Sequence, residues 1–390
     1  MKIYLLPHAE IFTKTGILRM NRINSNSIVL NAKGEEVNVI SNSSVDKRKF
    51  YSLLLKNGAQ IVLGEDTYVM TIHGPKKIQE IKEEDFILHR FSKIVPIQSP
   101  LIEWDRTPLP HSVPIKIPLE MSPNLALWLG IVASKGRYNE ENGAVTVSLN
   151  ENAIGKIFRE LSFKVFRTIP KNYADQKTGY KQHYIHSKGL VRFLKSTLGS
   201  NSNLKKVPQQ IMEGSIETQM AFLKGLSLDG YVDNGHLVVY GGASKRLAEF
   251  TAIVLRNMGY TIYQQIRKSG GGNDIFYVKI VASCDWAEPF IPLEMEKTDN
   301  YQESGYLVKV SEEVLKAKIP TSHPNYSAIR NIRQRKSETC LNHTLDDLGF
   351  TYPKDEYYSM VKEISVIEEN GFCLEVDSGI LYNSIVLSEK

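Results

Sequence analysis

The sequence predicts an α+β protein in which two similar α/β half-domains are inserted into an all-β domain. Three observations lead to this prediction. Short β-like segments occupy both ends of the chain, a proline-rich stretch follows the first of them, and the middle contains an internal pseudo-repeat. The hydrophobic fraction of 42% and the charged fraction of 23% are those of an ordinary globular protein.

The first part of the chain, residues 1–98, is expected to be a β half-domain. Strand-like runs at 10–13, 60–63 and 68–71 are separated by turn residues. Six prolines follow, at positions 96, 100, 108, 110, 114 and 118. Because proline resists helices and central strands, we expect residues 99–118 to be a linker. A helical segment and strand-like runs at 364–367, 373–376 and 381–387 predict a matching C-terminal part at 311–390.

The pseudo-repeat covers residues 119–300, with one half at 119–204 and the other at 205–300. Each half is expected to run helix, strand, helix and two strands. In the first half these elements are 125–133, 144–149, 151 to about 163, 164–169 and 182–188, with a closing helix at about 190–198. In the second half they are 217–226, 236–240, 244–258 with Ser244 as N-cap, and a hairpin over 261–280 that turns at 270–272.

Both opening helices carry small residues among apolar ones. These residues are Ala126, Gly130 and Ala133 in the first helix and Ala221 and Gly225 in the second. Small residues three or four positions apart let two backbones approach closely, so we expect the two helices to pack against each other. Two ordinary buried helices are the alternative, although glycine inside a helix lowers stability unless packing requires it.

The two helices resemble a known motif. Residues 125–136 resemble the first LAGLIDADG motif of homing endonucleases, and residues 221–232 resemble the second. The lead-ins at 115–118 and 205–208 also resemble those of this family. The resemblance implies two pseudo-symmetric αββαββα half-domains whose strands form a β-saddle on double-stranded DNA. It also implies a monomer, because one chain supplies both halves.

The flanking segments resemble the Hint splicing domain of inteins. Residues 5–13, 58–71 with 78–88, and 372–387 carry this resemblance, which therefore covers nearly the whole chain. The splicing residues are missing from the pattern, however. Leu5 stands at the first nucleophile, Thr67 and Gly64 at the histidine that polarises the junction and its partner threonine, and Ser388 and Glu389 at the terminal His-Asn pair. Without these reactive groups we expect no splicing.

The resemblance assigns a metal-binding carboxylate to the end of each motif helix. Lys135 occupies the first acid position, and an ammonium repels a divalent cation. Asp229 is the candidate catalytic and metal-binding acid, but one residue is missing between it and Gly225, which turns it by roughly 100°. Glu140 and Glu141 are candidate substitutes. We expect a damaged nuclease centre, with Mg²⁺ as cofactor only if that centre works.

Charge and strand alternation select residues for DNA contact. Residues 151–280 carry 19 Lys and Arg against 9 Asp and Glu, which suits a polyanionic partner. If Val145, Val147, Ile262 and Ile266 face the core, the side chains between them point outward. The candidates are Thr146, Ser148, Tyr263, Gln265, Arg267, Lys268, Tyr277 and Lys279. Ordinary polar faces of half-buried strands are the alternative for any single residue.

Site-specific binding of double-stranded DNA is therefore the leading expectation. A working metal-dependent endonuclease or nickase is the first alternative, and a protein-interaction module built on the Hint-like halves is the second. The three cysteines, Cys284, Cys340 and Cys373, are too few and too far apart to indicate a disulfide framework, so a reducing cytoplasm is expected. No apolar run approaches the roughly 18 residues of a membrane span, and no membrane partner is expected.

Overall fold

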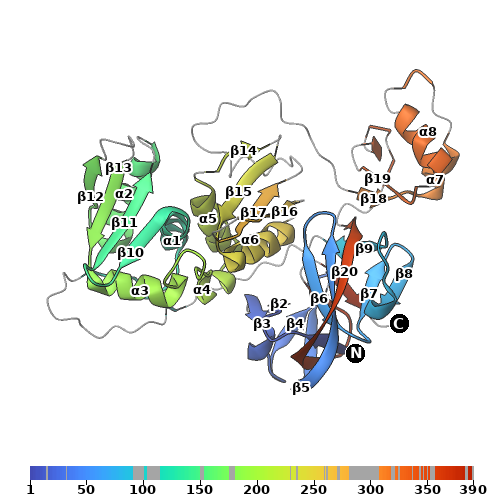
Figure 1. The fold of residues 1–390 in the computed structure, drawn as a ribbon, viewed down its shortest axis with the longest axis horizontal. Helices are drawn as coiled ribbons and strands as arrows, with labels where there is room; N and C mark the ends of the chain where they lie inside the picture. Colours follow the sequence, from blue (N-terminus) through green and yellow to red (C-terminus); the bar gives the residue numbers. More distant parts are fainter. Residues whose placement is uncertain are drawn as a thin grey trace. The chain divides into compact units, whose positions relative to one another are not determined.

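The computed structural model describes residues 1–390 except 15, 32, 91–100, 103–114, 150–152, 175–180, 229, 234–235, 259, 261, 270–272, 281–306, 318–320, 324–325, 336, 342–343, 346, 349, 352–355, 383–384 and 389–390. The architecture is mixed α/β, with eight α-helices in the described part (Figure 1). The chain forms two compact units. Unit 1 comprises Met1–Ile94, Leu255–Tyr263 and Glu303–Lys390, and unit 2 comprises Val95–Val254 and Gln264–Gln302. None of the described helices is long and apolar enough to span a bilayer.

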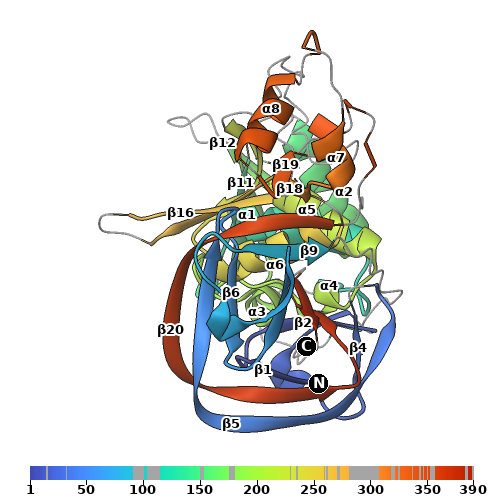
Figure 2. The same cartoon turned by 90° about the vertical axis from the view of Figure 1, so that its right-hand side faces the viewer.

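Unit 1 is built around two long antiparallel strands, β5 (Glu36–Leu55) and β20 (Glu356–Val376). They stay paired from Val361 opposite Leu55 to Val376 opposite Val39. Figure 2 shows them bending together as one curved ribbon. Three register shifts interrupt the pairing, and such irregularities bend and twist a strand. The N-terminal strand β1 (Lys2–Leu5) pairs with the last residues of β20, so both ends of the chain contribute to this unit.

The remaining strands of unit 1 extend this pairing into a sheet of fourteen strands within the described residues. They are β2 (Glu10–Thr13), β3 (Gly16–Arg19), β4 (Ile28–Leu30), β6 (Gln60–Gly64), β7 (Tyr68–Thr71), β8 (Gly74–Lys77), β9 (Phe86–Arg90), β21 (Ile380–Tyr382) and β22 (Ile385–Ser388), with the strands named above and below. Two short 3-10 helices, η1 (Met20–Arg22) and η2 (Ile78–Glu80), join them. Alternate apolar side chains such as Ile3, Leu53 and Leu374 meet in one buried core.

A small subdomain within unit 1 lies between residues 307 and 350. It consists of strand β18 (Leu307–Lys309), helices α7 (Glu312–Lys316) and α8 (Tyr326–Arg335), and strand β19 (Thr339–Leu341). The two strands pair with Val308 opposite Cys340. Val314, Ile329, Ile332 and Leu345 form its own buried cluster, so the helices are held by apolar contacts rather than by helix propensity alone.

The first half of unit 2 has the element order αββαββα. Its elements are α1 (Pro123–Lys135), β10 (Gly136–Asn139), β11 (Ala144–Leu149), α2 (Ala153–Phe166), β12 (Lys171–Ala174), β13 (Lys181–His186) and α3 (Lys188–Leu198). The strands form a sheet in the order β10-β11-β13-β12. The buried residues Val145 and Val147 alternate with the half-buried residues Thr146 and Ser148, as the sequence predicts.

The second half repeats this arrangement through its last strand. It contains α4 (Gln209–Met212), α5 (Ile216–Ser227), β14 (Val232–Asp233), β15 (His236–Gly242), α6 (Lys245–Asn257), β16 (Ile262–Arg267) and β17 (Ile275–Ile280). The end of α6 and the first residues of β16 lie in the segment Leu255–Tyr263, which belongs to unit 1. Its sheet has the order β14-β15-β17-β16, which matches the first sheet strand for strand. The same chain order therefore builds both sheets of unit 2.

Serine side chains begin several of these helices. Ser122, Ser187 and Ser215 each accept a hydrogen bond, at 3.3 Å, from the backbone N–H three residues later, at the starts of α1, α3 and α5. Ser244 accepts from Leu247 N at 3.2 Å in the same way, so the predicted N-cap of α6 is confirmed. These bonds satisfy amide groups that have no partner inside the helix.

Two sequence predictions about secondary structure are wrong. The predicted strand at 164–169 is helical as far as Phe166, because Phe166 packs edge-on against Trp128 at 4.7 Å between ring centroids. The predicted strands at 364–367 and 373–376 are parts of the single strand β20, because pairing with β5 continues across the polar residues between them. Most of the linker predicted at 99–118 and the turn predicted at 270–272 lie outside the described residues.

Candidate nucleic-acid interface

Helices α1 and α5 touch through their backbones. A Cβ atom added to Gly130 would lie 2.2 Å from the carbonyl oxygen of Phe222 and 2.9 Å from the Cα of Gly225. A Cβ added to Gly225 would lie 2.2 Å from the carbonyl oxygen of Leu127. Ala126 and Ala133 of α1 are buried, and Ala221 of α5 is half-buried. Only glycine permits so close an approach, so these two positions set the spacing of the two halves of unit 2.

The ends of the two helices carry the positions expected to bind a metal. Lys135 is the last residue of α1, and desolvation by its surroundings lowers the pKa of its ammonium group. Asp229 follows α5 but lies outside the described residues. Glu140 sits beyond β10 and pairs with Lys195 at 2.7 Å, and Glu141 is exposed in the same turn. In the described part of the chain, no group of three or more Asp, Glu, His or Cys could hold a metal ion.

Lys205 is a buried lysine that caps the C-terminal end of α1. It was not among the site residues expected from the sequence. The Lys205 ammonium donates to the carbonyl oxygens of Val132, Ala133 and Gly136 at 3.0, 2.8 and 2.9 Å. Burial, together with the nearby charge of Arg137, lowers its pKa to about 8. A cation at this point satisfies carbonyl groups and complements the negative end of the helix.

The same lysine also links the two halves of unit 2. Its own carbonyl oxygen accepts a hydrogen bond from Ser244 Oγ at 2.5 Å, and Ser244 begins α6. Lys205 belongs to the predicted lead-in of the second motif. The local sequence does not reveal the carbonyl groups that Lys205 binds, because they lie 69 to 73 residues away in the chain.

One face of the first sheet is polar across all four strands. Arg137, Thr146, Tyr184 and Lys171 lie directly opposite one another, which places them in one row on one face. Ser148, Gln182 and Tyr173 form the next row, and Tyr173 is 65% exposed. The described residues on this face include no Asp or Glu. We call this surface the first-sheet face.

The opposite face of this sheet is apolar and covered. Val145, Val147 and Ile185 are buried there, and His183 meets the ring of Phe158 of α2 at 5.8 Å between centroids. Helix α2 therefore backs the sheet and leaves the first-sheet face without a covering helix from its own half. Sequence reasoning selected Thr146 and Ser148 but missed Arg137, Lys171, Tyr173, Gln182 and Tyr184. The strand at 136–139 and the pairing register were needed to find them.

The second sheet also exposes polar and charged side chains, but one of its lysines is paired with a carboxylate. Tyr263, Gln265 and Arg267 are exposed on β16, as alternation predicts. Tyr277 is half-buried and lies close to Tyr231, where burial and Tyr277 raise the pKa of the Tyr231 phenol and Arg267 opposes that rise. Lys268 is exposed and pairs with Asp274 at 3.0 Å. The strand that bears Tyr263 and Arg267, β16, is an edge strand of this sheet, and β17 with Tyr277 lies next to it.

Two predictions for the second sheet are wrong. Ile266 is not a core residue but is 53% exposed, because this part of the hairpin extends beyond the apolar core while Ile262 remains buried. Lys279 is not an exposed phosphate contact but is 6% exposed, and its ammonium pairs with Asp233 at 2.5 Å. The Asp233 carboxylate offsets the positive charge of Lys279, which was expected from the sequence to contact DNA.

In unit 1, the residue that faces Thr67 is Tyr4. Thr67 is fully buried, and its Oγ1 accepts a hydrogen bond from the backbone N–H of Tyr4 at 3.3 Å. If Thr67 occupies the position of a junction-polarising histidine, the junction residue is Tyr4 and not Leu5, which is buried in the core. The ring of Tyr4 lies under the Arg48 guanidinium at 3.5 Å. Burial first, and then Cys373, raise the pKa of the Tyr4 phenol.

Gly64 leaves no room for the threonine that the family pattern places there. A Cβ at position 64 would lie 2.4 Å from the Cβ of Tyr4. We expect Gly64→Thr to lower the free energy of unfolding of unit 1 by about 1–3 kcal/mol, because Tyr4 must move. Urea denaturation of Gly64→Thr, Tyr4→Gly and the double variant measures this effect. Removing the Tyr4 Cβ should relieve part of the destabilisation, and purely additive effects would contradict the collision.

Comparisons with known proteins give partial likenesses. No family model matches the sequence. The chain is 24% identical over 170 residues to the replication factor C small subunit of Methanocaldococcus jannaschii, a match that covers 43% of this chain and 9% of that protein. The chain therefore spans only a small part of the length of this curated relative.

The similar solved structures include both inteins and a homing endonuclease. A structure of I-DmoI in complex with DNA and Mn is similar over 45% of this chain and 99% of that one, with 16% identity and a TM-score of 0.34. The gp41-1 intein is similar over 24% of this chain and 70% of that one, with 22% identity and a TM-score of 0.21. Both likenesses are weak, and each covers only part of the chain.

Proposed function

We propose that this protein binds double-stranded DNA at specific sites and derives from an intein-encoded LAGLIDADG homing endonuclease. In this proposal residues 119–300 form the DNA-binding domain, inserted between Hint-like parts at 1–98 and 311–390. The chain acts as a monomer because it supplies two similar sheets itself. Splicing is absent, and the nuclease centre is damaged at Lys135.

The row Arg137, Thr146, Tyr184 and Lys171 on the first-sheet face carries this proposal. Arginine and tyrosine side chains suit base edges and backbone groups, and lysine suits phosphate. The absence of carboxylates among the described residues of this face favours a polyanion over a cationic partner. The contact between Gly130 and Gly225 would hold the second sheet, with Arg267 and Gln265, at a fixed position relative to the first.

The proposed loss of splicing and of DNA cleavage rests on specific residues. Neither Tyr4 nor Thr67 supplies the nucleophile or the imidazole that splicing needs. A lysine at the end of α1 replaces one of the two carboxylates expected to bind Mg²⁺. Binding should therefore persist in EDTA, whereas cleavage should be absent with or without Mg²⁺.

Selection from a pool of randomised duplexes, followed by gel-shift titration of the selected duplex, tests the proposal. Replacing Arg137 and Lys171 by alanine should lower the affinity and reduce the salt dependence of log K by about two, one for each phosphate that is no longer neutralised. The control Arg159→Ala/Lys164→Ala removes the same charge from exposed positions of α2, which covers the opposite face.

Two results would overturn the proposal. The first is wild-type binding that selects no sequence, because a site-specific protein must discriminate among duplexes. The second is nicking of a supercoiled plasmid in Mg²⁺ that disappears in Asp229→Ala, which would assign an enzymatic function instead.

A further inference from the structure

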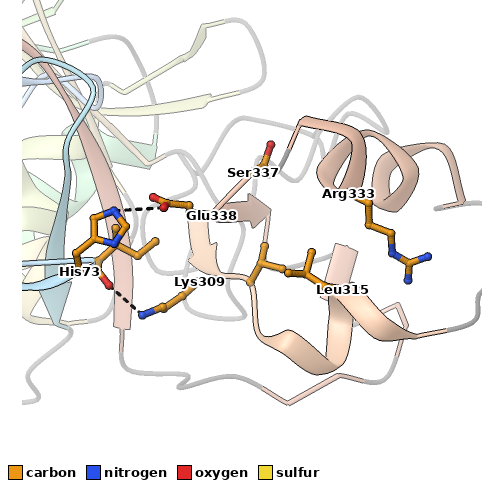
Figure 3. Close-up of a pocket in the computed structure, with 8 residues that line it drawn as sticks. His73, Lys309, Leu315, Arg333, Ser337 and Glu338 are labelled. Atoms are coloured by element: carbon orange, nitrogen blue, oxygen red, sulfur yellow. Dashed lines mark hydrogen bonds and ion pairs between the residues drawn. The ribbon is translucent and has the colours of Figure 1, made fainter.

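Unit 1 contains a cavity of about 530 Å³ that is lined by two separate segments of the chain. Ile72 and His73 line it from the turn between β7 and β8, and the small subdomain at 307–350 supplies the other lining residues (Figure 3). Pockets that bind small molecules usually measure about 300–1,000 Å³. The volume of this cavity is therefore that of a small-molecule site.

One wall of the cavity is apolar. The side chains of Ile72, Val310 and Leu315 contribute to this wall. Ile72 is buried, but Leu315 of α7 is 41% exposed. Removing such a side chain from water is favourable, so the wall suits a ligand with an apolar body.

The charged lining residues are mostly cations. Lys309 and Arg333 line the cavity, and Glu338 is the single carboxylate among the described residues that do so. His73 Nε2 lies 3.2 Å from the Glu338 carboxylate, and both side chains are largely exposed. Figure 3 shows Lys309, His73 and Glu338 close together, with Leu315 farther along the cavity. The polar end and the apolar wall are thus adjacent.

Both cations are fixed by backbone carbonyl groups. Lys309 Nζ donates to the carbonyl oxygen of Ile72 at 2.9 Å. Arg333 Nη2 donates to the carbonyl oxygens of Val314, at 3.0 Å, and Ala317. In the described part of the chain, neither cation forms an ion pair with a carboxylate. An ammonium group has further N–H donors, so Lys309 keeps donors for a ligand.

We propose that this cavity binds a small organic anion with an apolar body. Lys309 Nζ holds the anionic head group, Arg333 adds positive charge, and the body lies on Ile72, Val310 and Leu315. An alkyl carboxylate and an alkyl phosphate share this chemistry. The inference goes beyond the proposed DNA binding and does not depend on it, because none of these residues belongs to the sheets of unit 2.

Titration calorimetry of the full chain with four ligands that share one alkyl chain tests the head group. Octanoate and octyl phosphate should bind saturably, and the tighter of the two identifies the head group as carboxylate or phosphate. Octanol and octylammonium should bind at least about 10-fold more weakly, because they lack the negative charge that Lys309 binds. Butanoate should bind more weakly than octanoate, because it covers less of the apolar wall.

The variant Lys309→Gln, compared with Lys316→Gln, tests the site. Glutamine at 309 removes the charge but keeps an N–H donor for the carbonyl oxygen of Ile72, and we expect it to weaken anion binding roughly 10- to 100-fold. Lys316 is an exposed lysine of α7 that does not line the cavity, so its variant should bind like the wild type. Equal melting temperatures of the two variants should show that both are folded.

Three results would overturn the inference. The first is uptake of the anions that does not saturate, and the second is equal binding of octanol and octanoate. The third is an equal effect of Lys309→Gln and Lys316→Gln, which would assign the binding to general surface charge. Each of these results leaves the gel-shift test of DNA binding unaffected, because calorimetry is performed without DNA.

Discussion

Gly130→Ala and Gly225→Ala are each expected to destabilise unit 2 by about 1–3 kcal/mol or more. An alanine inside a helix normally stabilises it by about 1 kcal/mol relative to glycine. Here the added Cβ would lie 2.2 Å from a backbone carbonyl oxygen of the facing helix. A backbone atom cannot rotate away as a flexible side chain can, so the helices must separate. Urea denaturation followed by tryptophan fluorescence measures the change, because Trp128 is fully buried on α1.

Gly189→Ala is the matched control for this prediction. Gly189 also lies in a helix, α3, but the nearest atom to its added Cβ is Ser187 Oγ at 3.7 Å, an ordinary contact. We expect this variant to be as stable as the wild type or slightly more stable. The two interface variants should also lose sequence-specific DNA binding, because the spacing of the sheets changes. If Gly130→Ala has the same free energy of unfolding as Gly189→Ala, the close contact between α1 and α5 is contradicted.

Lys205→Met is expected to cost about 1–3 kcal/mol of stability at neutral pH. Methionine keeps most of the side-chain volume but removes the three hydrogen bonds to Val132, Ala133 and Gly136 at the end of α1. The buried carbonyl oxygens lose a charged donor, and charged donors make the stronger hydrogen bonds. Lys206→Met, at the adjacent half-buried lysine, is the control and should change stability less.

The pH dependence of the Lys205 contribution has a defined sign. Its pKa is lowered from 10.5 to about 8 in the folded chain, so between these values the unfolded chain holds more protons. The free energy of unfolding of the wild type therefore gains a contribution as pH rises through this window, and loses it as pH falls through about 8. Lys205→Met should lack this contribution. Parallel stability curves for the two proteins from pH 7 to pH 10 would contradict the lowered pKa.

Local patterns in the sequence were sufficient for most of the elements of the two half-domains and for their internal repetition. Small residues at helical spacing predicted that α1 and α5 pack closely, and Ser244 predicted the start of α6. The alternation of Val145 and Val147 with Thr146 and Ser148 predicted which face of β11 is polar. These features follow from periodicities of 3.6 and 2 residues, which act between near neighbours in the chain.

Other features depended on contacts between distant parts of the chain. Phe166 is helical because it packs on Trp128, and Lys279 is withdrawn from the surface by Asp233. Lys171 joins Arg137 on one face only through the pairing of four strands. Thr67 contacts Tyr4 rather than Leu5 because of how β1 lies in unit 1.

The sequence by itself determined that the chain contains two similar half-domains, each opened by a helix that bears a glycine at a matching position. Only the tertiary structure decided which polar side chains share a face, which cations remain exposed, and what closes the end of α1. The physical reason is that strand register and buried polar pairs are selected by the whole fold, since a shift of one residue moves a side chain to the opposite face.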